Sequence, residues 1–213
     1  ESNGLQYSND NGINWIAHPD VSPTSVIHEI DIKDSVMILG TSTGIYLSTN
    51  WGINLTNIGL VGDFNFDVSI HKTAPNVELF CATFSGLQLY SSSTSSWNIV
   101  SNPILNNQFI MGISSNGDQV YAGAFSNSPI IKSVDGGINW NITSSSPIVT
   151  ELNDIYIDPI NPKRIISCLL GTYNSSGKYN KECIYETSNG GGTWLRKGPN
   201  AHGICLTANS LNS

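Results

Sequence analysis

The feature that most constrains the fold of this chain is a short sequence that recurs along it. SNDNGINW (8–15) returns 125 residues later as SVDGGINW (133–140), with six of the eight letters unchanged. STNWGINL (48–55) and TSNGGGTW (187–194) keep a hydroxyl first, Asp or Asn third, Gly fifth and Trp or Leu last. SSSTSSW (91–97) is a degenerate fifth copy. The starts at 8, 48, 91, 133 and 187 are separated by 40, 43, 42 and 54 residues, which indicates an array of similar structural units.

Each copy after the first follows three short runs of apolar or β-branched residues. Before the second copy these runs are VIHEIDI (26–32), SVMILGTS (35–42) and GIYLS (44–48), and similar runs precede the later copies. Such runs, bounded by Gly, Asn, Ser and Pro, predict β-strands, and no stretch shows a sustained helical period. With the short run after each turn, every unit has four antiparallel strands. The sequence therefore predicts an all-β chain folded as a β-propeller of four-stranded blades.

Four complete blades are expected, and the two ends of the chain supply parts of a fifth. The complete units span 25–58, 65–100, 108–143 and 151–195. Residues 1–18 contain a third and a fourth strand and 201–213 contain a first strand, so the ends would share one blade. We therefore expect residues 1–213 to form a single five-bladed domain. The second strand of the shared blade is not evident, which leaves open that the chain is a fragment of a larger propeller.

The side chains of the repeated turn suit the closure of a hairpin. A carboxylate or amide at the third position and a hydroxyl at the first can accept backbone N–H groups within the turn. Glycine at the fifth position supplies a positive φ, and the closing Trp has an apolar face to insert between neighbouring sheets. These structural residues are Ser8, Asp10, Gly12, Trp15, Ser48, Asn50, Gly52, Ser133, Asp135, Gly137, Trp140, Thr187, Asn189, Gly191 and Trp194.

The pattern Ser/Thr-x-Asp-x-Gly-x-Thr-Trp resembles the Asp-box, or BNR repeat, of sialidase-like, xyloglucanase-like and sortilin-like propellers. Asn14 and Asn139 replace the Thr of that pattern, and Asn50 and Asn189 replace the Asp. The resemblance implies a propeller whose repeated turns lie on the outer edge of each blade, on the face opposite the usual ligand site. It does not imply one function, because enzymes, receptors, assembly factors and lectin-like propellers share this turn.

Composition favours an extracellular or cell-surface protein. Charged residues make up 12% of the chain, against roughly 25% in an average soluble protein, and the net charge is −7. The nine basic residues are scattered, which argues against nucleic acid or an anionic membrane surface as a partner. No segment is long and apolar enough to insert into a membrane. Three sequons make Asn54, Asn141 and Asn174 candidates for N-glycosylation.

The number of arginines excludes the chemistry of sialidases. Those enzymes clamp the carboxylate of the substrate with three arginines, and this chain contains only Arg164 and Arg196. A glycosidase of another type needs only two carboxyl groups facing each other across a cleft. A glycoside hydrolase of the xyloglucanase type therefore stays open.

Candidate site residues lie where the innermost strand of each blade begins, near the mouth of a central channel. These strand starts read His28-Glu29, Phe66-Asp67, Ile110-Met111, Asn153-Asp154 and His202-Gly203. Crowding of like charges would raise a carboxyl pKa, as a general acid needs, which makes Asp67, Asp154 and Glu29 the catalytic candidates. With His28 and His202 the same ring could bind a ligand or a divalent cation, although no cofactor is required. Polar residues at strand ends can equally be ordinary solvated positions.

The loops between second and third strands share this mouth and carry aromatic residues. Phe84, Phe125, Tyr173 and Tyr179 would suit stacking on sugar rings if they are exposed. We therefore expect a binding or scaffold module whose ligand is a glycan. The alternatives are a glycoside hydrolase of the xyloglucanase type and a propeller that binds a peptide or assembles with another surface protein.

The four cysteines lack the spacing of a zinc site. Cys168 and Cys183 are expected opposite each other on consecutive strands of the last complete blade, so either a cross-strand disulfide or two buried thiols would suit them. Cys81 and Cys205 are expected in the core. The run Asp158-Pro159-Ile160-Asn161-Pro162 resembles a turn common in xyloglucanase-type propellers and is expected to cap a hairpin.

Overall fold

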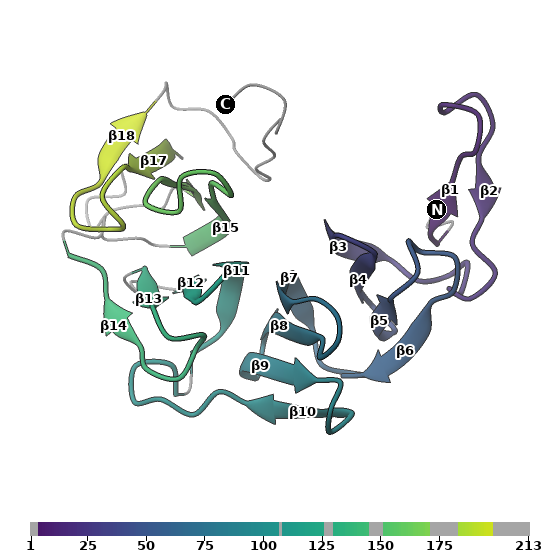
Figure 1. Ribbon diagram of the computed structural model, residues 1–213, viewed down its shortest axis with the longest axis horizontal. Helices are drawn as coiled ribbons and strands as arrows, with labels where there is room; N and C mark the ends of the chain where they lie inside the picture. Colours follow the sequence, from purple (N-terminus) through teal and green to yellow (C-terminus); the bar gives the residue numbers. More distant parts are fainter. Residues whose placement is uncertain (1–3, 107, 126–129, 145–150, 171–182, 198–213) are drawn as a thin grey trace, which may run out of the picture.

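The chain folds into β-strands throughout the part that the structure describes. The computed structural model describes residues 4–106, 108–125, 130–144, 151–170 and 183–197. Within these ranges, four four-stranded antiparallel sheets and one two-stranded sheet are formed (Figure 1). This confirms the predicted all-β class with four-stranded blades. No helix in these ranges is long and apolar enough to cross a membrane.

Each sheet consists of consecutive strands, and we number the sheets as blades in chain order. Blade 1 contains β1 (Gln6–Tyr7) and β2 (Ile16–Ala17). Blade 2 contains β3 (Ile27–Lys33), β4 (Val36–Thr41), β5 (Gly44–Ser48) and β6 (Thr56–Gly59). Blade 3 contains β7 (Asn65–Lys72), β8 (Glu78–Thr83), β9 (Gly86–Ser91) and β10 (Ser96–Ile99). Blade 4 contains β11 (Ile110–Asn116), β12 (Gln119–Ala124), β13 (Ile131–Ser133) and β14 (Asn141–Ile142). Blade 5 contains β15 (Glu151–Ile157), β16 (Ile165–Leu170), β17 (Cys183–Thr187) and β18 (Leu195–Lys197).

The four complete blades form an arc around a central channel. In Figure 1 the first strands, β3, β7, β11 and β15, lie innermost, and the fourth strands lie outermost. The hairpin of blade 1 lies at one end of the arc and stands apart from blade 5 at the other end (Figure 1). This arrangement is consistent with five blades. The first strand expected for blade 1, in 201–213, lies outside the described residues.

Every innermost strand carries a β-bulge at the same place. The register between the first and second strands shifts by one residue just before Glu29, Asp67, Gly112 and Asp154, so these four residues are structurally equivalent. The sequence alignment of strand starts is therefore wrong by one residue in blade 4. Met111 is the bulged residue there, and the position that bears an acid in the other blades is occupied by Gly112.

Hydrophobic side chains between neighbouring blades form the core. Three clusters fill the spaces between blades 2 and 3, blades 3 and 4, and blades 4 and 5. Each cluster draws residues from both facing blades, including Ile38 and Val68, then Phe80 and Ile113, then Tyr121 and Ile155. The alternation of β-strand side chains explains this pattern, because one face of each blade packs on the preceding blade and the other face on the next.

The repeated turn has the same hydrogen bonds in its four well-preserved copies. In 133–140, the Ser133 hydroxyl accepts the Gly137 N–H at 2.9 Å and donates to Asp135 at 2.7 Å, and Asp135 accepts the Asn139 N–H at 2.9 Å. Equivalent bonds occur in 8–15, 48–55 and 187–194. The fifth-position glycines have φ values between 77° and 90°, a region that other residues rarely adopt.

The last residue of the turn is buried in three copies and exposed in the first. Leu55, Trp140 and Trp194 are buried, whereas 61% of Trp15 is exposed. The prediction that the closing residue inserts between neighbouring sheets is therefore wrong for Trp15. The reason is its place at the end of the arc, since Trp140 packs in the cluster shared with the preceding blade, and blade 1 has no preceding blade among the described residues.

The strand register of blade 5 offsets its two cysteines. Cys183 pairs with Leu169, and Cys168, which is buried, pairs with Ile184. The expectation that the cysteines lie directly opposite each other is therefore wrong by one residue, because the register follows strand pairing and not the centre of the loop. The disulfide stays a prediction, since the side chain of Cys183 lies outside the described residues.

Two other sequence motifs can be placed. Cys81 is buried between blades 2 and 3, whereas Cys205 lies beyond the described part of the chain. The turn at 158–162 joins β15 to β16, and the Asp158 carboxylate accepts the N–H groups of Ile160 and Asn161. This carboxylate therefore caps the hairpin from within.

Candidate functional site

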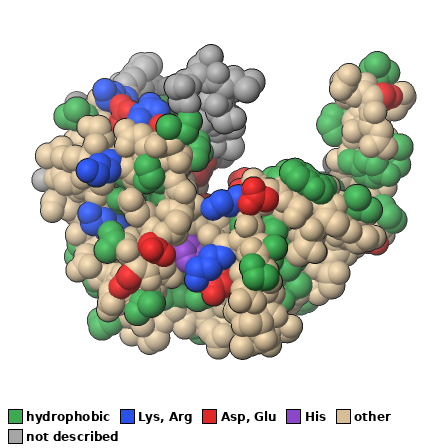
Figure 2. All heavy atoms as spheres, in the orientation of Figure 1, with side chains coloured by type: hydrophobic (Ala, Val, Ile, Leu, Met, Phe, Trp, Pro, Cys, Tyr) green, Lys and Arg blue, Asp and Glu red, His purple; other side chains and the backbone are tan. Residues whose placement is uncertain are grey.

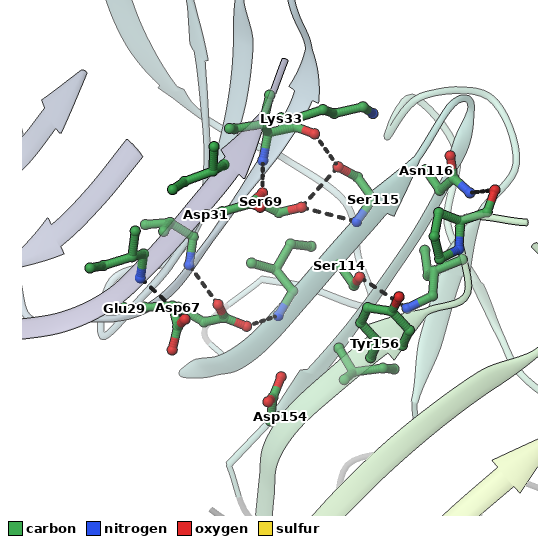
Figure 3. A pocket seen from close by; sticks show the side chains of 18 residues that line it. Glu29, Asp31, Lys33, Asp67, Ser69, Ser114, Ser115, Asn116, Asp154 and Tyr156 are labelled. Atoms are coloured by element: carbon green, nitrogen blue, oxygen red, sulfur yellow. Dashed lines mark hydrogen bonds between the residues drawn. The ribbon is translucent and has the colours of Figure 1, made fainter. Parts of the chain in front are cut away.

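The innermost strands of blades 2 to 5 line a central pocket of about 350 Å³. The residues that follow the bulges, Glu29, Asp67 and Asp154, lie at one end of this pocket (Figure 3). Gly112 is their equivalent in β11 and contributes no side chain. The topology thus brings together the three acids that were predicted from distant parts of the sequence, at the end where the innermost strands begin.

Polar side chains in this pocket join one blade to the next. We call Glu29, Asp67, Gly112 and Asp154, which directly follow the bulges, the post-bulge residues. The side chain two places after a post-bulge residue accepts a backbone N–H from the innermost strand of the following blade. Three such bonds are present: Asp31 accepts the Ile70 N–H at 2.7 Å, Ser69 the Ser115 N–H at 3.0 Å, and Ser114 the Ile157 N–H at 3.2 Å. Much of the polarity of the channel therefore serves the packing of the blades.

Asp67 is part of the same linkage. One carboxylate oxygen accepts the Val68 N–H at 2.7 Å, and the other accepts the Ile113 N–H of blade 4 at 2.8 Å. Burial raises the pKa of Asp67 well above its usual value, the charges of Asp154 and Glu29 raise it further, and the two hydrogen bonds oppose the shift. Asp67 therefore has the raised pKa of a general acid, but both of its oxygens are engaged by the backbone.

The pKa values of Glu29 and Asp31, two other acids of the pocket, are perturbed less than that of Asp67. Burial raises the pKa of Glu29 and of Asp31, each against the effect of a backbone hydrogen bond. No group of three or more His, Cys, Asp or Glu side chains within the described ranges is arranged to hold a metal ion. The divalent cation considered from the sequence therefore has no ligand set among these residues.

Aromatic side chains form a first cluster on the rim, between blades 2 and 3. The His28 ring stacks on Phe64 with centroids 4.9 Å apart, and Phe64 contacts Phe66 at the same separation. Nδ1 of His28 lies 2.8 Å from the Asn65 carbonyl oxygen. His28 therefore helps to hold the two blades together, while Phe64 remains exposed.

A second aromatic cluster links blades 3 and 4. Phe84 follows β8, Phe109 precedes β11, and their rings stack with centroids 4.0 Å apart. Phe125, which follows β12, lies 6.4 Å from Phe109. All three are exposed, Phe84 by 53%. They form a row of phenylalanines at the end of the blades opposite the repeated turns, because second strands end and first strands begin there.

The sequence located part of this surface. Phe84 and Phe125 were candidates, whereas Phe64 and Phe109 were missed. Phe64 and Phe109 each precede an innermost strand, and the signal that could have identified them is this position in the blade. The carbonyl of Phe64 accepts the N–H of Phe84, and the carbonyl of Phe109 accepts the N–H of Phe125. Phe84 and Phe125 each follow the second strand of the same blade. The candidates Tyr173, Tyr179 and His202 lie outside the described residues.

Comparison with known proteins yields matches of fold alone. No protein-family model and no curated protein matches the chain. An ancestral GH74 enzyme matches with 18% identity and a TM-score of 0.60 over 82% of this chain and 24% of that one. A structure of the nidogen/laminin complex matches with 13% identity and a TM-score of 0.67 over 88% of this chain and 70% of that one. YCF48 bound to the D1 peptide matches with 13% identity and a TM-score of 0.58 over 91% of this chain and 60% of that one.

These matches establish a β-propeller architecture. The chain spans about a quarter of the length of the GH74 enzyme and less than two thirds of YCF48. The matched structures include an enzyme and proteins bound to peptide or protein partners, and fold does not decide among such functions.

Proposed function

We propose that this chain is a binding module that holds a glycan on the row formed by Phe84, Phe109 and Phe125. The observation that supports this most strongly is a row of three exposed phenylalanine rings at the channel end of two neighbouring blades, in which Phe109 contacts both Phe84 and Phe125. Large apolar side chains are normally buried, and a contiguous exposed group of them usually marks a binding surface. Exposed aromatic faces suit the apolar C–H faces of sugar rings.

A catalytic role for the pocket acids Glu29, Asp67 and Asp154 has less support than glycan binding on the phenylalanine row. A glycosidase needs one carboxyl group that can donate a proton and a second that acts as base or nucleophile. Asp67 accepts two backbone N–H groups, one of them from the next blade, so its first role is to join blades 3 and 4. A binding site that uses the rim does not require these acids to reach the ligand.

An extracellular or surface location accompanies this proposal. Low charge and an Asn- and Ser-rich surface support it, and the sequon residues Asn54 and Asn141 are exposed. Asn174 lies outside the described residues. Kinship with the Asp-box propellers is part of the same proposal, and its support is the recurring hydrogen-bonded turn.

A glycan-array screen followed by titration tests the proposed function. Phe109→Ala should weaken binding of the selected glycan about tenfold or more, because loss of about 1.4 kcal/mol of contact free energy lowers affinity tenfold. Phe84→Ala should act in the same direction. Ile138→Ala is the matched control, since Ile138 is a 76% exposed apolar residue in a repeated turn at the opposite end of the blades. It should leave the affinity unchanged.

Two results would count against the proposal. One is the absence of any glycan that binds the folded protein. The other is a glycan whose affinity is insensitive to Phe84→Ala and Phe109→Ala but is lost with Asp67→Ala and Asp154→Ala, which would place the ligand in the channel. Hydrolysis of the bound glycan would support the xyloglucanase-type alternative.

A further inference from the structure

The phenylalanine row lies beside acidic side chains of the channel mouth. Asp63 directly precedes Phe64, and the carbonyl oxygen of Phe64 accepts the N–H of Phe84, a member of the row, at 2.9 Å. Burial raises the pKa of Cys81, three residues before Phe84, and the charges of Asp67 and Asp63 raise that pKa further. These two carboxyl groups therefore act electrostatically on the segment that carries Phe84.

No basic side chain balances these acids in the part of blades 2 to 4 that the structure describes. Glu29, Asp63 and Asp67 form no ion pair with a Lys or Arg there. The connections that begin or end at the channel mouth in these blades contain no Lys or Arg; they are 42–43, 60–64, 84–85, 100–109 and 125–130. Lys178 and Lys181 of blade 5 lie outside the described residues. The described rim around the phenylalanine row thus carries only negative charge.

The opposite end of the blades carries charges of both signs. Lys72 pairs with Glu78 at 2.7 Å beside the turn between β7 and β8, and Arg164 pairs with Glu186 at 2.6 Å beside the last repeated turn. Figure 2 shows basic side chains next to acidic ones around the channel on the face that it presents. The scarcity of basic side chains is therefore a property of the described channel mouth and not of the whole molecule.

A ligand on the phenylalanine row would meet aromatic faces in a negative electrostatic field. The face of an aromatic ring attracts a cation, and carboxylates without a counter-charge add to this attraction. The same field repels carboxylate and sulfate groups of a ligand. A sugar with an ammonium group suits both features, because its C–H face can stack on one ring while its charge lies over another ring or beside Asp63.

We propose that the glycan held on the phenylalanine row contains amino sugars with free, protonated amines, as in an oligomer of glucosamine. This inference rests on the proposed function and adds the class of glycan to it. Asp63 and Glu29 supply the charge that favours the amines, and they need not touch the ligand to do so. Neutral glycans should bind more weakly, and anionic glycans should bind least.

Titration with two matched oligomers tests this class of ligand. A hexamer of β-1,4-linked glucosamine and the hexamer of N-acetylglucosamine differ only in the acetyl groups that remove the charge. At a pH that keeps the amines protonated, the glucosamine hexamer should bind about tenfold more tightly at low salt, which corresponds to about 1.4 kcal/mol. This preference should shrink in about 1 M NaCl, because the screening length falls to about 3 Å. Phe109→Ala should weaken binding of both hexamers.

Substitution of the acids tests the source of the preference. Asp63→Asn keeps the shape of the side chain and removes its charge, so it should lower the ratio of the two affinities by about two- to fivefold, the effect of an exposed ion pair. Glu29→Gln should act in the same direction, and the double variant should lower the ratio further. Asp118→Asn is the matched control, because Asp118 is an exposed acid in the turn between β11 and β12, at the opposite end of blade 4. It should leave the ratio unchanged.

The outcomes separate this inference from the proposed function. A preference for the glucosamine hexamer that falls with salt and with Asp63→Asn supports the inference. Equal or tighter binding of a neutral or anionic glycan, weakened by Phe109→Ala, would overturn the inference and leave glycan binding on the row in place. A preference unchanged in the double variant would also overturn it, because the acids would not be its source. If no glycan binds, the inference and the proposed function both fail, and binding of a lysine hexamer would then identify a basic peptide as the ligand.

Discussion

At the scale of single residues, Asp67 shows how a buried carboxyl group can join two blades and still respond to pH. Burial raises its pKa well above 3.8, so the folded protein retains a proton where the unfolded chain has lost it. The stabilisation that this proton provides is fully present below about pH 3.8 and is lost as the pH rises through the folded-state pKa. The direction is opposite to that of a carboxylate held in an ion pair.

Asp67→Asn should remove this pH dependence. The free energy of unfolding of the unsubstituted protein, minus that of Asp67→Asn, should decrease steadily as the pH is raised from 4 towards 8, because only the carboxyl group becomes charged. Urea denaturation at intervals of one pH unit measures the difference. Asp135→Asn is the control, since hydrogen bonds lower the pKa of Asp135 to about 2 and its difference should be flat over this range. A flat difference for Asp67 as well would contradict the assignment.

Only some of the exposed phenylalanines at the channel mouth could be predicted from the sequence. Phe84 and Phe125 could be chosen from the sequence because they follow second strands, which end at the channel mouth. Phe64 and Phe109 lie before first strands, and nothing local distinguishes them from residues of a connecting loop. Their role depends on contacts between blades, as in the stacking of Phe84 on Phe109.

At the scale of elements, the repeated turn could be predicted because its determinants are local. A hydroxyl, a short acceptor and a glycine at fixed offsets satisfy one another within eight residues, with no help from the rest of the fold. The bulges could not be predicted in the same way. The bulged residue before Glu29, Asp67, Gly112 or Asp154 does not change the apolar character of the strand, so hydrophobicity does not reveal where the bulge lies. The sequence of blade 4 alone therefore does not show that Gly112 takes the place of an acid.

Ser133→Ala tests the linking role of the hydroxyl in this turn. Ser133 is buried, and its loss leaves the Gly137 N–H without its acceptor, which should lower the free energy of unfolding by about 1–3 kcal/mol. Ser133→Thr should retain most of the stability, because Thr187 makes the equivalent bond to Gly191 at 3.0 Å in blade 5. Equal destabilisation by Ala and Thr in thermal and urea unfolding would show that packing, and not the hydrogen bond, is decisive.

At the scale of the whole molecule, neighbouring blades interlock through residues of complementary size. In the second strand of each blade, the residue that pairs with the post-bulge residue is small, as Gly40 is opposite Glu29. This small residue faces a larger side chain of the next blade, which lies two places before the post-bulge residue of that blade. A Cβ at Gly40 would lie 2.7 Å from Asn65, and a Cβ at Gly123 would lie 2.7 Å from Leu152. Ala82 holds this place in blade 3 and shares a buried cluster with Ile110. This complementarity cannot be read from one blade, because its two halves lie about 25–30 residues apart.

Gly123 and Leu152 should therefore be energetically coupled. Gly123→Ala alone should cost about 1–3 kcal/mol by overpacking, and Leu152→Ala alone about 2–5 kcal/mol by leaving a cavity. In the double variant the added methyl enters the vacated space, so the loss of stability should be smaller than the sum by about 0.5–3 kcal/mol. A double-mutant cycle in urea measures this coupling, and Gly192→Ala with Leu152→Ala is the additive control, because Gly192 faces only Asn189 of its own turn. If the losses of stability for Gly123→Ala and Leu152→Ala are additive, the blades adjust to the substitutions by moving apart. The propeller would then be held together by the hydrogen bonds between its innermost strands, and not by the fit of side chains between its sheets.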